Sequence, residues 1–247
     1  MSEILTNKIT PVTGNTVTLG DSGDTFSIPS GATVANSGTA TGFLPAVGSS
    51  GNVLTSDGTN WSSTAPAGGG AWTKITSTVA SDSSGSIQFI SGIDSTYATY
   101  VVVASDIHLA TANQGINFQV STDAGSSWDT SAKYTYHVTK LMTDNAAYSC
   151  AVSGSNRSSW MELMRWFGVA AGHCGSLALW FTNPSSTISY KGMRWHSESI
   201  VHSSTHAMGH NGHGFYENLT AVNGFKFYTN SGNIVSGRFT LYGISHT

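Results

Sequence analysis

The chain is poor in charged side chains. Lys, Arg, Asp and Glu make up 9% of its 247 residues, whereas they usually account for about a quarter of a soluble domain. The hydrophobic fraction is ordinary at 39%, so Gly, Ser, Thr and Asn fill the gap. A net charge of −3 gives no electrostatic reason to expect nucleic acid or an anionic membrane as a partner. A polar, nearly uncharged surface is typical of extracellular and virion β proteins rather than of cytosolic enzymes.

Long hydrophobic runs and cysteines are scarce as well. No segment approaches the ~18 consecutive apolar residues of a membrane span, so no membrane insertion is expected. Residues 1–11, MSEILTNKITP, lack the charged start and apolar run of a secretion signal. Cys150 and Cys174 are too few for a disulfide framework. They are either free thiols or one bridge, and a reducing cytoplasm favours free thiols.

Catalytic signatures are also missing. The sequence has no GxSxG motif, phosphate-binding loop or nucleotide fingerprint. Paired carboxylates would indicate a glycan-cleaving enzyme. Most acids of the C-terminal part fall in turns, and the two that are least explained, Glu162 and Glu198, are linked by no spacing. We therefore expect no enzymatic activity and no cofactor.

The front third carries a weak but regular strand pattern. Apolar residues come in sparse alternating pairs, such as Val17 with Leu19 and Phe26 with Ile28, and each pair is followed by a turn sequence. At roughly 1.5–3 kcal/mol per buried side chain, such strands cannot offset roughly 1–2 kcal/mol of backbone entropy per ordered residue. The segment is therefore disordered, or it folds against other copies of itself. Its few charges and its strand phase favour an intertwined oligomer, in which neighbouring chains supply the core.

Composition divides the chain into three parts. Ile4, Leu5 and Ile9 are the apolar residues through which an extended N-terminal arm would attach to a larger particle. Pro66 and three glycines after it predict a hinge. The predicted parts are an attachment arm at 1–15, a low-complexity β shaft with its hinge at 16–70, and a C-terminal domain at 71–247.

The C-terminal part has short alternating segments at regular intervals and few helix signals. One segment, 158–171, fits a short helix as well as a strand, and its β surroundings favour the strand. The pattern predicts an all-β fold in which the shaft is followed by an antiparallel β-sandwich, most simply a jelly roll. The predicted strands are 72–79, 86–90, 97–107, 115–121, 133–140, 177–181, 189–195, 224–228 and 238–244.

One motif has a known local geometry. Ser121, Asp123, Gly125 and Trp128 match the Asp-box pattern S-x-D-x-G-x-[ST]-W. Asp123 can accept backbone hydrogen bonds across a tight turn, Gly125 supplies a positive φ, and Trp128 packs beneath the hairpin. Sialidases carry several such boxes away from their chemistry, so a single copy predicts a structural hairpin rather than a sialidase.

A histidine-rich stretch, HSSTHAMGHNGH, contains His202, His206, His210 and His213. Its glycines exclude a helix that would align the imidazoles as metal ligands. We predict a polar loop. The alternative is a metal site built from His210 and His213 and shared between subunits on a three-fold axis.

Residues late in the chain have the chemistry of sugar recognition. Aromatic rings stack on the apolar faces of sugars, and imidazole and amide groups bond to hydroxyls. For Trp195 and Tyr216, a place in the core is an equally good interpretation. The candidate glycan contacts are Trp195, His196, His202, Tyr216 and Asn218.

Two regions of the sequence resemble a known family. The run ITPVTGNTVTLGDSGDTFSIPSGATVANSGTATGF, followed by PAVGSSGNVLTSDGTNW, resembles the N-terminal shafts of tail-fibre and related virion proteins of tailed phages, above all those infecting cyanobacteria and marine bacteria. The segments NPSSTISYKGMRW and SGNIVSGRFTLYGIS resemble the distal domain of such proteins. A phage protein folds in the host cytoplasm and works outside after lysis, which reconciles a surface-type composition with the lack of a secretion signal.

The resemblance implies a homotrimer located in the virion. Its N-terminus would attach to other virion proteins of the tail, collar or capsid, and its C-terminal domain would meet a host-surface glycan. Three alternatives stay open. They are a capsid decoration, head spike or collar fibre of the same build, a glycan-degrading tailspike, and a cellular lectin module.

Overall fold

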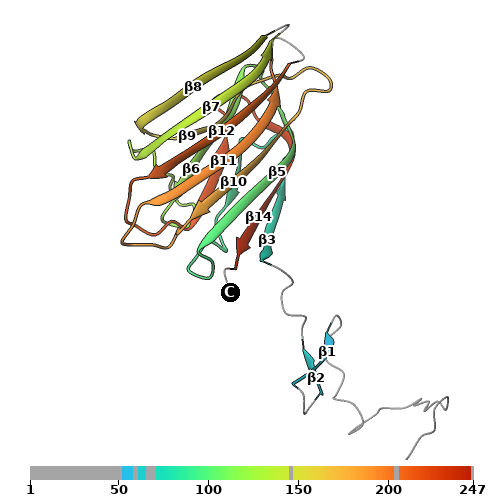
Figure 1. Ribbon diagram of the computed structural model, residues 1–247, viewed down its shortest axis with the longest axis vertical. Coiled ribbons are helices and arrows are strands. Elements are labelled where there is room, and N and C mark those ends of the chain that lie inside the picture. Colours follow the sequence, from blue (N-terminus) through green and yellow to red (C-terminus); the bar gives the residue numbers. More distant parts are fainter. Residues whose placement is uncertain (1–51, 58–60, 65–70, 145–146, 203–205, 246–247) are drawn as a thin grey trace, which may run out of the picture. The chain divides into compact units, whose positions relative to one another are not determined.

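The computed structural model describes residues 52–57, 61–64, 71–144, 147–202 and 206–245 (Figure 1). All regular structure in these ranges is β, and none of it is a helix that could span a membrane. The chain divides into two compact units, 1–66 and 67–247. The predicted attachment residues Ile4, Leu5 and Ile9 and most of the predicted shaft lie outside the described residues.

In the first unit, two short strands form an antiparallel ribbon. β1 (Val53–Ser56) pairs with β2 (Trp61–Thr64), with Val53 opposite Thr64. The apolar side chains of this ribbon lie at its surface, since Val53, Leu54 and Trp61 are 43%, 46% and 58% exposed. A two-stranded ribbon is at best marginally stable in water by itself, and this one buries almost none of its apolar side chains within the chain.

The second unit is built from two antiparallel sheets. The large sheet has the order β3-β14-β5-β10-β11-β12-β7-β8, which can be followed in Figure 1, and the small sheet has the order β4-β13-β6-β9. β3 and β14 lie side by side, with Trp72 opposite Ile244. The strands are β3 (Trp72–Val79), β4 (Ser86–Phe89), β5 (Thr99–Leu109), β6 (Gln114–Ser121), β7 (Tyr134–Asp144), β8 (Ala147–Ser158), β9 (Met161–Phe167), β10 (Gly175–Thr182), β11 (Lys191–Ile200), β12 (Ala207–Tyr216), β13 (Gly224–Tyr228) and β14 (Ile234–Ile244).

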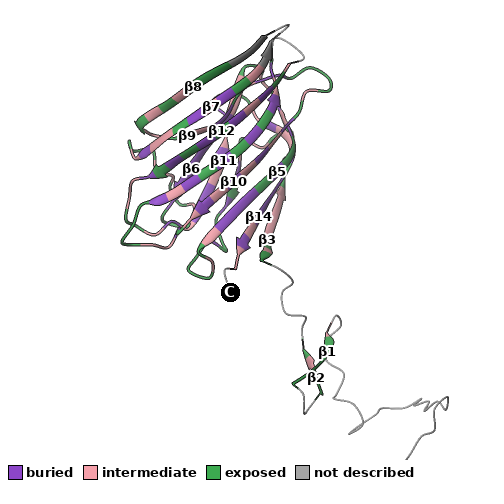
Figure 2. Cartoon of the chain, viewed as in Figure 1, coloured by how far each residue is buried: buried purple, intermediate pink, exposed green. Residues whose placement is uncertain are grey.

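The two sheets enclose one hydrophobic core. Along β10 the side chains are alternately buried and partly exposed, and Leu177, Leu179 and Phe181 point inward. Phe118 of the small sheet meets Phe181 of the large sheet with ring centroids 6.1 Å apart, and Phe225 meets the same ring at 4.7 Å. Figure 2 shows the same alternation along the strands of the large sheet. The predicted all-β fold is confirmed, and the two facing sheets have the arrangement of a β-sandwich.

Each predicted strand overlaps a strand of the structure, with ends that differ by a few residues, and the ambiguous segment 158–171 contains a strand, β9. Two strands of the second unit, β8 and β12, were not predicted. The prediction of a polar loop over the histidine-rich stretch is wrong, because residues 207–216 form β12. Two glycines of this strand allow neighbouring groups to pack directly against its backbone, and they do not form turns. A Cβ atom on Gly212 would overlap the Trp195 ring, and one on Gly214 would lie 2.5 Å from the Thr135 carbonyl oxygen.

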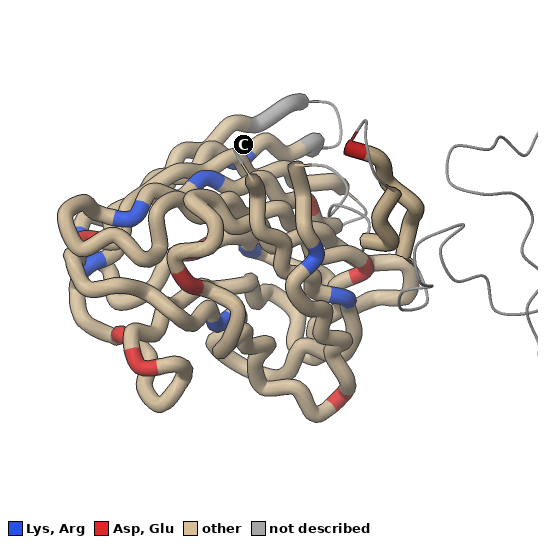
Figure 3. Tube along the Cα trace, turned by 90° about the horizontal axis from the view of Figure 1, so that it is seen from below, with Lys and Arg blue, Asp and Glu red and all other residues tan. Residues whose placement is uncertain are grey.

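Along the Cα trace of the sandwich, charged residues are sparse and form no long run of either sign (Figure 3). Cys150 and Cys174 are both exposed free thiols. The alternative of a bridge between these two cysteines is therefore excluded.

Candidate functional site

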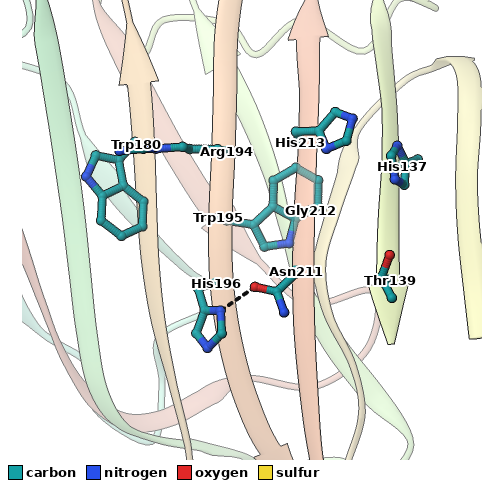
Figure 4. Close-up of a pocket in the computed structure, with 9 residues that line it drawn as sticks. All are labelled: His137, Thr139, Trp180, Arg194, Trp195, His196, Asn211, Gly212 and His213. Atoms are coloured by element: carbon teal, nitrogen blue, oxygen red, sulfur yellow. Dashed lines mark hydrogen bonds between the residues drawn. The ribbon is translucent and has the colours of Figure 1, made fainter. Parts of the chain in front are cut away.

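Polar and aromatic side chains gather on the face of the large sheet that points away from the small sheet. We call this set the sheet-face cluster. Together with the buried Trp195 and Gly212, its members line an open depression of about 650 Å³ (Figure 4). The cluster consists of His137 and Thr139 from β7, Trp180 from β10, Arg194 and His196 from β11, and Asn211 and His213 from β12.

The strand register places these residues in two adjacent rows. In the first row, Trp180 is opposite Arg194, Arg194 is opposite His213, and His213 is opposite His137. The second row lies two residues further along each strand. In it, His196 is opposite Asn211, which is opposite Thr139. Cross-strand partners have Cβ atoms about 4.5–5.5 Å apart, so each row is nearly continuous.

Three contacts organise the cluster. The guanidinium carbon of Arg194 lies 5.0 Å from the ring centroid of Trp180, a cation–π distance. The rings of His137 and His213 meet edge to face, with centroids 3.9 Å apart and an interplanar angle of 78°. In the second row, His196 Nδ1 donates a hydrogen bond to Asn211 Oδ1 at 2.5 Å. Figure 4 shows these side chains on neighbouring strands, with Arg194 extending toward Trp180.

The electrostatics of the cluster are one-sided. Its lining contains Arg194 and three histidines but neither Asp nor Glu. Within the described ranges, Arg194 forms no ion pair with a carboxylate. Arg194 therefore offers hydrogen-bond donors that no carboxylate within the cluster neutralises. The nearest acid along β11 is Glu198, which lies on the same face two residues from His196 and accepts a hydrogen bond from Ser176.

Trp195 and Gly212 form the floor of the depression rather than its rim. The Trp195 ring packs against the backbone of Gly212 on the inner side of the sheet and is 3% exposed. It also contacts Tyr136, with ring centroids 6.1 Å apart. Trp195 is therefore a core residue, and of its two interpretations from the sequence this placement supports the structural one.

Tyr216 is another predicted glycan contact that lies in the core. It is fully buried, its ring packs against Tyr134 at 5.1 Å, and its hydroxyl donates to the Asp129 carboxylate. Burial, followed by the hydrogen bond to Asp129, raises the pKa of Tyr216. The ring has no free surface to offer to a sugar.

Asn218 and His202 lie away from the cluster. Asn218 accepts a hydrogen bond from the Nζ atom of buried Lys191 at 2.7 Å, and its amide donates to the Tyr216 hydroxyl at 3.1 Å. His202 follows the end of β11 and donates its backbone N–H to Trp166 at 3.0 Å. Of the five predicted glycan contacts, only His196 belongs to the sheet-face cluster.

The two histidines of the alternative metal site lie on opposite faces of β12. His210 is fully buried and faces the core, whereas His213 is exposed on the opposite face of β12. Neighbouring residues of a strand point to opposite faces, and these two are three positions apart. They therefore cannot bind the same ion within one chain. The described residues contain no group of three or more His, Cys, Asp or Glu side chains that could hold a metal.

His210 is unusual in its own right. Neither of its ring nitrogens has a hydrogen-bond partner within the described part of the chain. Its cross-strand neighbour Lys140 is also buried and forms an ion pair with Glu162 at 2.8 Å. Burial, and next the positive charge of Lys140, lower the pKa of His210 to about 4.

The Asp-box residues form a tight turn. Asp123 Oδ1 accepts hydrogen bonds from the Ser121 hydroxyl (2.6 Å) and the Ser127 N–H (2.8 Å), and Gly125 has a φ of +86°. Hydrogen bonds from Ser121 and Ser127 lower the pKa of Asp123 to about 2. Lys226 Nζ lies 5.6 Å from the Trp128 ring centroid.

The prediction that this turn closes a hairpin is wrong. Ser121 ends β6 in the small sheet, whereas the next strand, β7, belongs to the large sheet. The Asp-box turn therefore lies where the chain crosses from one sheet to the other.

The two acids without an explanation in the sequence have structural partners. Glu162 pairs with Lys140 and, at 3.4 Å, with Arg165, while Glu198 accepts a hydrogen bond from Ser176. Conversely, sequence reasoning missed most of the cluster. The missed residues come from four different strands and share no spacing along the chain, so only the register of the sheet brings them together. They are His137, Thr139, Trp180, Arg194 and Asn211.

No protein-family model, curated protein or solved structure matches the chain. The resemblance to phage fibres therefore rests on sequence motifs alone.

Proposed function

We propose that this protein is a structural component of a tailed-phage virion, a homotrimeric tail fibre. Residues 1–15 attach it to other virion proteins, and the C-terminal sandwich binds a glycan on the host surface. The observation that carries the binding role is the sheet-face cluster. Trp180, Arg194, Asn211 and three histidines gather on an open sheet face, where their rings and donors are available to a sugar.

The strand orders support a jelly-roll interpretation of the sandwich. The four strands β3-β14-β5-β10 face the four strands β4-β13-β6-β9. Among these eight strands the chain changes group at every step except from β6 to β9, which are both in the small sheet. This is the connectivity of an eight-stranded jelly roll. The hairpins β7–β8 and β11–β12 are then insertions that extend one sheet. All of the cluster except Trp180 lies on these inserted strands, so the insertions carry the binding surface.

The ribbon β1–β2 supports the oligomeric part of the proposal. Val53, Leu54 and Trp61 are exposed within a single chain, and three chains wound together would bury them against one another. Native mass measurement tests this point. The proposal expects a species of three times the 25.8 kDa chain mass, and a monomer in which residues 1–66 resist proteolysis contradicts it.

Glycan binding is tested with matched histidine variants. His196→Ala removes a cluster residue, whereas His108→Ala removes a partly exposed histidine of β5 that pairs with Asp106 outside the cluster. Binding of purified protein to host cells and to isolated host polysaccharide should weaken in the first variant only. Equal binding by both variants contradicts a site at the cluster.

Two further measurements separate the alternatives of the same build. Antibody labelling of intact particles places the protein on the tail, the collar or the capsid. Incubation with host polysaccharide separates a binding fibre from a tailspike, because a tailspike shortens the polymer.

A further inference from the structure

Resting on the proposed glycan binding, we infer that the ligand is an anionic polysaccharide, one that carries carboxylate or sulfate groups, and that it lies across the strands of the large sheet. The sheet-face cluster is then one part of a longer surface. Its first row continues across the sheet beyond Trp180, through β5 and β14 to β3.

The register defines this longer surface, which we call the cross-strand row. Tyr242 is opposite Lys74 on one side and Val101 on the other, and Val101 is opposite Trp180. From there the row joins the cluster. In spatial order it consists of Lys74 (β3), Tyr242 (β14), Val101 (β5), Trp180 (β10), Arg194 (β11), His213 (β12) and His137 (β7).

The row places an aromatic ring beside a cationic group at two points. Tyr242 is next to Lys74, and Trp180 is next to Arg194. Val101 between the two aromatic residues is fully buried although it faces outward, since the large side chains of Tyr242 and Trp180 flank it on the adjacent strands. Trp72 packs against Tyr242 with ring centroids 5.7 Å apart and widens this aromatic end.

Such a row suits an acidic sugar polymer better than a neutral one. Aromatic rings can stack on the apolar faces of sugars, and a guanidinium matches a carboxylate or sulfate with two parallel hydrogen bonds. None of the seven row residues is acidic, in a protein whose net charge is −3. Glu198, four residues along β11 from Arg194, is hydrogen-bonded to Ser176. The positive charge of the row is therefore a local feature and not a property of the whole chain.

The dimensions of the row fit a polymer that crosses the strands. Neighbouring strands lie about 4.8 Å apart, which is comparable to the advance of one sugar unit in an extended polysaccharide. Each unit would then meet one strand. Lys74 and Arg194 are four strand spacings apart, about 19 Å, so a chain of about five units spans both cations and a disaccharide cannot.

The test measures binding of the full chain to three polymers by calorimetry. They are polygalacturonate with carboxylates, dextran sulfate with sulfates, and neutral dextran. The inference expects binding to at least one acidic polymer at least tenfold tighter than to dextran. The acidic polymer that binds identifies the anionic group, and binding to both identifies a general anion site.

Four substitutions locate the site on the row. Arg194→Gln should weaken binding of the acidic polymer about tenfold, in line with the loss of one charged hydrogen-bonding group, and Arg194→Lys should restore part of it. Lys74→Gln should weaken binding of the polymer but leave binding of a charged disaccharide unchanged. Arg238→Gln is the matched control, because Arg238 is an exposed cation on the same face of β14 but lies outside the row.

Several results overturn the inference. Equal binding of dextran and the acidic polymers, with no effect of Arg194→Gln, removes the anionic ligand while glycan binding itself stands. Equal losses in the Arg194→Gln and Arg238→Gln variants remove the row. A change of native mass in Arg194→Gln shows that the face joins subunits instead. Binding to none of the polymers, nor to host polysaccharide, rejects the inference together with the proposed glycan function.

Discussion

At the scale of single residues, His210 combines a buried imidazole with a buried cation. Its pKa of about 4 lies below the usual 6.5 of histidine, so the unfolded chain takes up the proton at a higher pH than the folded one. The folded state is therefore favoured fully above about pH 6.5, and this contribution is lost as the pH falls from 6.5 toward 4. The shift corresponds to a loss of up to about 3 kcal/mol in the free energy of unfolding.

We predict that His210→Met reduces this acid sensitivity. The free energy of unfolding, measured in urea at pH 7.5 and pH 4.5, should fall by about 2.5 kcal/mol less in the variant than in the parent, since methionine has no proton to bind. His137→Met, at an exposed site, is the control and should behave like the parent. If the parent and the His210→Met variant lose the same free energy of unfolding between the two pH values, the assigned role of His210 is contradicted.

The Asp-box turn gives a second prediction at the residue scale. Asp123→Ala removes the carboxylate that accepts hydrogen bonds from Ser121 and Ser127. The backbone N–H of Ser127 then loses its acceptor, so its hydrogen exchange should become faster. Thr122→Ala, which changes a neighbouring side chain of the same loop, should leave that exchange unchanged. NMR exchange rates decide, and unchanged protection of Ser127 in the Asp123 variant would show that the turn does not depend on the carboxylate.

At the scale of elements, β12 shows how glycine can belong to a strand. Gly212 has no side chain, so the Trp195 ring can lie directly against its backbone. The strand as a whole alternates between buried and more exposed positions, and this alternation places His213 on the sheet-face cluster and His210 in the core. The alternation along β12 therefore determines that His213, and not His210, is accessible to a ligand.

Gly212→Ala is predicted to destabilise the sandwich by about 1–3 kcal/mol, the usual cost of forcing extra atoms into a packed interior. The new methyl group would overlap the Trp195 ring, which would have to move. Gly209→Ala on the same strand is a close control, because nothing lies within 4 Å of the position of its Cβ atom. Urea unfolding of both variants tests this. Equal stability of the two would mean that the Trp195 ring does not depend on Gly212.

The sequence predicts elements here better than it predicts the site. The strands that were found have clear alternation of large apolar residues, as in β10 and β13. β12 was not predicted because its inward positions include a histidine and two glycines, which are typical of loops. In the structure the Trp195 ring fills the space beside Gly212. β8 was not predicted because it has mainly small and polar residues. Arg194, His213 and His137 are neighbours only through strand register, which depends on how the hairpins pair and not on any local pattern.

At the scale of the whole molecule, the two units differ in how far they bury their apolar side chains. The core of the sandwich is formed by residues of the second unit, from Ala80 to Leu241, whereas the described part of the first unit leaves its apolar side chains exposed. We therefore propose that the first unit drives assembly and that the second unit folds independently.

We predict that a chain of residues 67–247 is a folded monomer, while the full chain is a trimer. Light scattering gives the masses. Thermal unfolding followed by tryptophan fluorescence should show a cooperative transition in the shorter chain, because Trp195 stays buried in an intact core. A trimer formed by residues 67–247 would place the subunit contacts in the sandwich itself. The cross-strand row would then be the first surface to test as the interface.

The pairing of Trp72 with Ile244 has a practical consequence. The first and last strands of the sandwich lie side by side, so the domain can be attached to a carrier protein at a single position. It can accordingly be exchanged as a cassette. Transplanting it onto an unrelated trimeric stalk, or joining its two ends and reopening it at a surface turn, should preserve the hydrophobic interior and carry any ligand preference along with it.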